Sequence, residues 1–230
     1  MRASSIIVAA GSGTRLGMSV PKAFVPLGGR CLLYYSLRAV TSVEEIGEAV
    51  VTVPAGGEAQ ARAEASRAGL AIPLKVVTGG AERQDSVRIG LALTSAEAEV
   101  VIVHDAARPF APPALFAVCI ETARRSGGAI AAIPVADTLK RMQDRTIVAT
   151  IPRTGLWQAQ TPQAFRRDLL VAAHERATRE RWAATDDAEL VERCGGRVEV
   201  VDGSPANLKI TTTADLEIAE LLARRSSTQG

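Results

Sequence analysis

The sequence predicts an α/β fold in which a mostly parallel sheet is covered by helices on both faces. Short apolar runs, typical of strands buried on both faces, recur along the chain. Stretches with apolar residues at helical spacing lie between these runs. This alternation of strands and helices favours parallel strand pairing. The predicted strands cover residues 5–10, 48–53, 74–77, 100–103, 129–133 and 198–201.

Helical spacing of apolar residues is clearest in four stretches, which cover residues 84–93, 115–123, 169–173 and 216–223. Thr212 and Asp215 precede most of the last stretch and are spaced as in a capping box, which predicts a helix start there. His174 lies in an Ala- and Arg-rich helical stretch. We expect its side chain on a solvated face.

One segment, residues 137–160, interrupts the alternation. It contains β-branched residues, a turn signal at Gln143 and Asp144, and no helical pattern. These features predict a β-hairpin arm that reaches out of the domain and clasps a partner subunit. A long surface loop is the alternative.

Length and composition limit the class of protein. At roughly 150 residues per domain, a chain of 230 residues is expected to form one domain over residues 1–230, with the arm appended. The net charge of +2 and the aromatic content of 3% argue against a nucleic-acid partner. Three widely spaced cysteines favour a reducing compartment, and the apolar runs are too short for a membrane span. We therefore expect a cytoplasmic protein without a membrane or nucleic-acid partner.

The densest local signal is the glycine loop that follows the first predicted strand. Open α/β sheets bind ligands at the carboxyl ends of their strands. Because residue 16 is leucine, the loop fits neither the dinucleotide fingerprint nor the Walker A spacing. Gly11 and Gly13 leave the backbone bare enough to approach a polyphosphate, and Arg15 and Lys22 supply cations. The alternative is a tight turn beside a solvated arginine.

A second cluster covers residues 79–86, which follow a predicted strand and open a predicted helix. Helix N-termini present free N–H groups, and Ser86 adds a hydroxyl. The cluster could therefore read the edge of a base. An ordinary helix cap is the alternative.

A third cluster, residues 104–109, follows the strand at 100–103. Its Asp105 could bind Mg²⁺ or a hydroxyl group, and its Arg108 could bind a phosphate or support the fold. A salt bridge at the sheet rim is the alternative. The chain shows no Ser-His-Asp or Cys-His set, which indicates a reaction served by cations, backbone donors and Mg²⁺. Phosphoryl-type transfer to a phosphate fits this inventory because such an acceptor is already ionised at neutral pH.

Five motifs follow one another between Ala9 and Thr211. They are A-A-G-x-G-x-R with P-K, then G-G-x-E-R-x-D-S, H-D-A-A-R-P, T-P-Q and N-x-K-[IV]-T. In this order they resemble the 2-C-methyl-D-erythritol 4-phosphate cytidylyltransferase family, which joins CTP and methylerythritol phosphate in the non-mevalonate isoprenoid route. The glycine loop with P-K alone is shared by many nucleotidyltransferases, whereas the whole series is specific.

The resemblance implies a Rossmann-like domain whose extended β-arms interlock in a homodimer. It also implies Mg²⁺ or another divalent cation, held mainly by the CTP phosphates, with Asp105 as the candidate protein ligand. The implied CTP-binding residues are Ala9, Ala10, Gly11, Gly13, Arg15, Lys22, Gly80 and Ser86. The implied acceptor-binding residues are Asp105, Ala106, Arg108, Thr138, Arg153, Thr161, Thr185 and Lys209. Arg15, Lys22, Arg153 and Lys209 are the implied catalytic residues, and Thr138 and Arg153 would come from the neighbour's arm.

Two other functions stay open at the level of sequence. Ribitol-5-phosphate cytidylyltransferases share the glycine loop, although the doubled alanine at residues 106–107 favours the methylerythritol acceptor. A non-catalytic nucleotide-binding module would have no use for Arg153 and Lys209. The glycine spacing disfavours a dehydrogenase.

Overall fold

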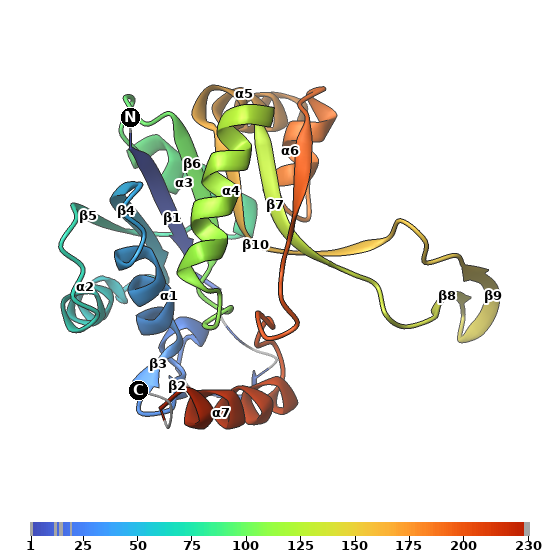
Figure 1. Ribbon diagram of the computed structural model, residues 1–230, viewed down its shortest axis with the longest axis horizontal. Coiled ribbons are helices and arrows are strands. Elements are labelled where there is room, and N and C mark those ends of the chain that lie inside the picture. Colours follow the sequence, from blue (N-terminus) through green and yellow to red (C-terminus); the bar gives the residue numbers. More distant parts are fainter. Residues whose placement is uncertain (1, 12, 14–15, 19, 228–230) are drawn as a thin grey trace.

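The computed structural model describes residues 2–11, 13, 16–18 and 20–227. Its centre is a seven-stranded sheet with the strand order β11-β7-β10-β6-β1-β4-β5 (Figure 1). All neighbours in it pair in parallel except β10, which runs antiparallel to β6 and β7. The strands are β1 (Ala3–Val8), β4 (Ile46–Val53), β5 (Leu74–Thr78), β6 (Val100–Asp105), β7 (Gly128–Pro134), β10 (Trp157–Arg166) and β11 (Val198–Asp202). The predicted α/β class and all six predicted strands are confirmed.

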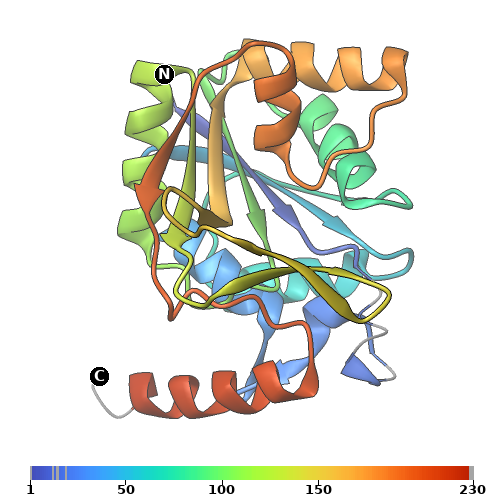
Figure 2. The same ribbon diagram turned by 90° about the vertical axis from the view of Figure 1, so that its right-hand side faces the viewer.

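Helices cover both faces of this sheet (Figure 2). Helices α1 (Leu32–Thr41), α2 (Glu58–Arg67) and α4 (Pro113–Ser126) pack on one face. Helices α3 (Arg83–Leu93), α5 (Arg167–Glu180) and α6 (Asp187–Arg193) pack on the other. Consecutive strand residues point to opposite faces of the sheet. Ile7 therefore lies in the apolar core beneath α1, α2 and α4, and Ile6 lies in the core beneath α3, α5 and α6.

A smaller apolar cluster joins the C-terminal helix to the segment after the glycine loop. Helix α7 (Thr213–Ser227) packs on β2 (Pro26–Leu27), which pairs with β3 (Arg30–Cys31) just after the short 3₁₀ helix η2 (Lys22–Phe24). The predicted capping box is present: Thr212 N donates to Asp215 at 2.8 Å, and Asp215 N donates to Thr212 Oγ1 at 3.2 Å. Among the described residues, no helix is long and apolar enough to cross a membrane.

The structure contains a hairpin in the segment that interrupts the alternation. Strands β8 (Leu139–Gln143) and β9 (Thr146–Ile151) pair only with each other, and Figure 1 shows the pair projecting from the body of the molecule. The turn residues Asp144 and Arg145 both have positive φ, which matches the twist of a two-residue hairpin. The alternative of a surface loop is therefore wrong. Residues 157–160, at the end of the predicted range, begin β10 of the central sheet.

One local expectation is wrong. His174 does not face solvent: only 2% of it is exposed, and its Nε2 lies 3.0 Å from Asp187 Oδ1. The Ala- and Arg-rich stretch presents alanines to the sheet, and His174 sits on that buried side because Asp187 of α6 supplies a partner for its ring.

Candidate active site

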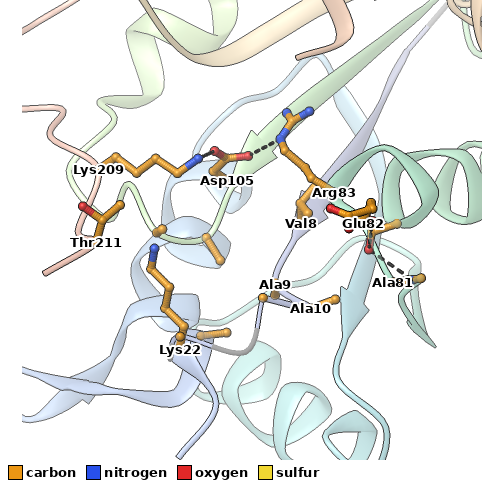
Figure 3. Close-up of a pocket in the computed structure, with 17 residues that line it drawn as sticks. Val8, Ala9, Ala10, Lys22, Ala81, Glu82, Arg83, Asp105, Lys209 and Thr211 are labelled. Atoms are coloured by element: carbon orange, nitrogen blue, oxygen red, sulfur yellow. Dashed lines mark hydrogen bonds and ion pairs between the residues drawn. The ribbon is translucent and has the colours of Figure 1, made fainter. Parts of the chain in front are cut away.

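A pocket of about 440 Å³ lies where β1 and β6 end (Figure 3). Its walls come from the glycine loop, from Lys22, from the turn that opens α3, from the end of β6 and from Lys209 and Thr211. The first two predicted motifs, the start of the third and the last therefore meet in one cavity. The predicted site residues on its lining are Ala9, Ala10, Gly11, Gly13, Lys22, Gly80, Ser86, Asp105, Ala106 and Lys209. Arg15 lies outside the described residues.

The glycine loop is held close to Lys22. Gly13 has a φ of +69°, and a Cβ at this position would lie 2.8 Å from Lys22 Cβ. A side chain here would therefore strain the backbone and push Lys22 out of place. Glycine allows the loop to pass directly beneath the lysine stem.

This close approach predicts that Gly13→Ala weakens CTP use. We expect kcat/KM for CTP to fall about tenfold, since a displacement of a positioning group is costly to catalysis. Gly17→Ala is the matched control, because Gly17 has a φ of +63° but no atom within 4 Å of the added Cβ. Both variants carry a similar backbone cost. Equal losses of kcat/KM in the two would contradict a specific effect on Lys22.

The turn that opens α3 is shaped by its own side chains. Glu82 and Asp85 form a capping box. Ser86 Oγ accepts a hydrogen bond from Gly80 N at 3.1 Å and donates to Glu82 O at 3.2 Å. A Cβ on Gly80 would lie 2.2 Å from Asp85 Cβ, so only glycine fits. The alternative interpretation as a helix cap is thus correct for the local structure, and the same turn forms one wall of the pocket.

Asp105 is held between two cations on the pocket wall. Lys209 Nζ donates to Asp105 Oδ2 at 2.6 Å, and Arg83 Nε donates to Oδ1 at 3.0 Å (Figure 3). Burial alone would raise the pKa of the Asp105 carboxyl, but Arg83 and Lys209 outweigh it and hold that pKa well below its ordinary value. The salt bridge considered as an alternative is therefore present, and it lies inside the pocket.

Arg83 is a charged pocket residue to which the sequence analysis assigned no role. It lies in the first turn of α3, lines the pocket and also pairs with Asp187, 104 residues away. Burial disfavours its charge, but the carboxylates of Asp187 and Asp105 outweigh this and raise the pKa of Arg83. The available signal was its place in G-G-x-E-R-x-D-S, where an arginine opens a helix directly after a strand.

Two predicted acceptor residues support the fold instead of lining the pocket. Arg108 is buried and donates to the carbonyl oxygens of Asn207 at 2.7 Å and Ala159 at 3.2 Å. Thr161 Oγ1 accepts from Asp105 N at 3.0 Å and contacts His104 Nδ1 at the same distance. Both residues fix the chain around Asp105. Burial lowers the pKa of His104 to about 4, so this ring is neutral at physiological pH.

Three further predicted residues lie apart from the pocket of their own chain. Thr185 is exposed and donates through Oγ1 to Glu189 at 3.0 Å. Thr138 and Arg153 are exposed at the base of the hairpin. None of the three lines the pocket. A single chain therefore does not bring them to the site.

The described residues do not form a metal site on their own. No group of three or more His, Cys, Asp or Glu side chains among them could hold an ion. Asp105 is the one carboxylate on the predicted ligand list, and each of its oxygens already pairs with a cation. The described residues therefore do not fit a resident magnesium ion on their own.

The low pKa of Asp105 predicts how stability depends on pH. In the folded protein Asp105 stays ionised where the unfolded chain would bind a proton, at and below the ordinary value of about 3.9. Its contribution is therefore complete above that pH and is lost as the pH falls. We expect the free energy of unfolding to drop below a pH of about 4, and to drop less steeply in Asp105→Asn. Urea unfolding at several pH values measures this, and identical slopes in both proteins would contradict it.

The chain matches one protein family over almost its whole length. Residues 3–225 match the family model described as IspD: 2-C-methyl-D-erythritol 4-phosphate cytidylyltransferase. The chain belongs to this family. It is 45% identical over 221 residues to the 2-C-methyl-D-erythritol 4-phosphate cytidylyltransferase of Deinococcus radiodurans. The aligned region covers 96% of this chain and 89% of the relative. The protein is thus a nucleotidyltransferase.

Solved structures of the cytidylyltransferase family share its fold. The 2-C-methyl-D-erythritol 4-phosphate cytidylyltransferase of Thermus thermophilus is 38% identical with a TM-score of 0.82, covering 97% of this chain and 100% of that one. The 4-diphosphocytidyl-2C-methyl-D-erythritol synthase of Anaerococcus prevotii is 32% identical with a TM-score of 0.85, covering 97% and 99%. The family resemblance inferred from the five motifs is confirmed.

Proposed function

We propose that this enzyme transfers CMP from CTP to 2-C-methyl-D-erythritol 4-phosphate, giving 4-diphosphocytidyl-2-C-methyl-D-erythritol and pyrophosphate for isoprenoid precursor synthesis. One observation carries the proposal: a glycine loop, a helix N-terminus and three cationic side chains line a single pocket at the ends of β1 and β6. Helix N-termini and bare backbone N–H groups suit polyphosphates. The three cations are Lys22, Arg83 and Lys209.

CTP would occupy the side of the pocket formed by the glycine loop and α3. Ala9, Ala10, Gly80 and Ser86 would hold the base and ribose. Gly11 and Gly13 would approach the triphosphate, with Lys22 beside it. Arg15 is proposed as a further triphosphate contact on the family resemblance alone.

The acceptor would bind at the opposite wall. Asp105 and the backbone of Ala106 would face the methylerythritol hydroxyls, and Lys209 would face its phosphate. The carboxylate of Asp105 would repel two polyanions if it stood alone. Its pairing with two cations removes that repulsion.

We further propose that the acceptor site is completed by the arm of a second chain in a homodimer. Met142, Ile147 and Val148 on the hairpin are each more than half exposed. An isolated two-stranded hairpin is only marginally stable in water, so a partner surface over these side chains would stabilise it. The partner's arm would then bring its Thr138 and Arg153 to the acceptor phosphate, while Thr161 and Thr185 would act indirectly.

The transfer itself needs little proton chemistry from the protein. The acceptor phosphate has a second pKa of about 6, so its oxygen is ionised at neutral pH. That oxygen attacks the α-phosphorus of CTP, the new O–P bond forms as the bond to the β-phosphate oxygen breaks, and pyrophosphate leaves. Positioning by the loop and charge stabilisation by Lys22 would supply most of the acceleration. Magnesium or another divalent cation is proposed only as a partner of the CTP phosphates.

The enzyme is also proposed to work in the cytoplasm. Its three cysteines, Cys31, Cys119 and Cys194, are unpaired. Unpaired thiols are typical of a reducing compartment.

Pyrophosphate release in the presence of CTP and Mg²⁺ tests the function, with methylerythritol 4-phosphate compared against ribitol 5-phosphate. Release with the former alone is the expected result. Release with ribitol 5-phosphate alone would keep the nucleotide chemistry and overturn the acceptor. CTP binding without release from either acceptor would leave a nucleotide-binding module and refute the transfer reaction.

A further inference from the structure

A buried chain of polar contacts leads from the pocket to the interior between α5 and α6. Arg83 joins Asp105 on the pocket wall through Nε at 3.0 Å, and it joins Asp187 through Nη1 at 2.8 Å. Asp187 is in turn 3.0 Å from His174 Nε2. The side chains of Asp187 and His174 are only 1% and 2% exposed. Neither residue lines the pocket, and Arg83 is the side chain that links the pair to the pocket wall.

The chemistry of the buried pair fixes the direction of its hydrogen bond. Arg83 and His174 hold the pKa of Asp187 below its ordinary value against the effect of burial, so Asp187 is an ionised acceptor. His174 Nε2 must therefore carry the proton and donate it. Asp187 gives one oxygen to Arg83 and the other to His174. The histidine thus fixes the plane in which the carboxylate meets the guanidinium.

Arg83 needs such a support because its pocket is built for polyanions. A guanidinium free to turn would follow a ligand phosphate and leave Asp105. Lys209 would then be the remaining partner of Asp105. Its ammonium would neutralise that carboxylate and could not also bind the phosphate. While Arg83 stays on Asp105, Lys209 can share its ammonium with an incoming phosphate.

We propose that His174 is a positioning residue for the transfer reaction, acting through Asp187 to hold Arg83 on Asp105. The proposal rests on the proposed function in one respect, since it takes Asp105 and Lys209 to face the acceptor. Its consequence is selective: losing the His174 donor should impair use of the acceptor more than binding of CTP.

The chain offers a matched control in the next residue of α3. Gln84 ties the same α5–α6 connection to α3, because its Nε2 donates to Trp182 O and its Oε1 accepts from Ala184 N, both at 3.1 Å. Gln84 does not line the pocket, and these two hydrogen bonds go to the backbone of Trp182 and Ala184, whereas Asp187 pairs with Arg83 and His174. Gln84→Ala therefore loosens this connection and leaves the contacts of Arg83 with Asp105 and Asp187 in place.

The experiment compares His174→Phe, His174→Gln and Gln84→Ala, each shown to be folded by circular dichroism. We expect His174→Phe to lower kcat/KM for the acceptor about 10- to 100-fold, as when the outer partner of a metal-bound histidine is removed. His174→Gln keeps an N–H donor and should recover most of that loss, while Gln84→Ala should stay within about threefold of wild type. The dissociation constant for CTP, measured by calorimetry, should change less than kcat/KM in every variant. Equal losses in Gln84→Ala and His174→Phe, or no rescue by glutamine, would overturn the proposal.

A readout independent of turnover separates this inference from the proposed function. The Nε–H proton of Arg83 can be assigned by its absence in Arg83→Lys. It should exchange slowly because it is hydrogen-bonded to the buried carboxylate of Asp105. With inorganic phosphate added as the ligand, we expect its NMR signal in wild type and His174→Gln, and its loss to exchange in His174→Phe. An unchanged signal in His174→Phe refutes the positioning role. Failure of wild type to release pyrophosphate would refute the function alone.

Discussion

Replacing Lys22 with alanine is expected to lower turnover by roughly 10²–10³-fold, which corresponds to about 2.7–4 kcal/mol of lost transition-state stabilisation. Lys22 begins η2 and lines the pocket beside the glycine loop. Its ammonium is a compact charge that can follow the negative charge as it develops on the α-phosphate. The measurement is the rate of pyrophosphate release at saturating CTP and acceptor.

Lys75→Ala is the control for this experiment. Lys75 lies in β5 at the edge of the sheet, where its Nζ donates to Leu93 O at 2.7 Å and lies 3.4 Å from Glu48, outside the pocket. Removing it takes away one positive charge without touching the site. Turnover close to wild type in Lys22→Ala would remove Lys22 from the reaction, and an equal loss in Lys75→Ala would point to a general effect of charge.

Mixing two inactive variants is expected to restore activity if the arm acts across a dimer. Arg153→Ala alone should lose most of its turnover because the acceptor phosphate loses a charged contact. In a mixed dimer with Lys22→Ala, one site combines an intact Lys22 with an intact Arg153 from the other chain, and the second site carries both changes. With random pairing of equal amounts, about a quarter of all sites are then intact.

The subunits must exchange for this test to be decisive. Tagging the two variants differently and purifying through both tags isolates the mixed dimer, in which half of the sites are intact. The doubly purified dimer of Lys75→Ala with Lys22→Ala is the control, because half of its sites keep an intact Lys22 and an intact Arg153 and it should retain about half of the wild-type activity. Mixed dimers as inactive as the parent variants would show that Arg153 does not act in the neighbour's site, and a monomeric protein would refute the dimer directly.

Local chemistry made much of this molecule predictable from its sequence. The buried strands are short apolar runs that are covered on both faces, so they can be recognised from the sequence alone. The glycine loop is equally local: Gly13 and Lys22 are nine positions apart, and only glycine tolerates their close approach. The five motifs therefore revealed the class of protein, its α/β fold and most of the pocket lining.

Strand β10 was not predicted because several of its buried residues are polar. Gln160 and Gln163 are 4% and 1% exposed, yet each is a glutamine. Gln160 is accommodated by hydrogen bonds to Ser204 O and to the Asn207 side chain, which are more than forty residues away. An apolar pattern cannot signal a strand whose burial depends on partners elsewhere in the chain.

The alternation of strands and helices, the hairpin and the loops that end at the pocket could be predicted because each depends on neighbouring residues. Which charges meet depends instead on how the chain folds in three dimensions. Arg83 is separated from Asp187 by 104 positions, and so is Asp105 from Lys209. These pairs form because the folded sheet brings helix ends and strand ends to one place and removes them from water. In that environment an unpaired charge costs free energy, so the role of each charged side chain depends on the partner that the fold places beside it.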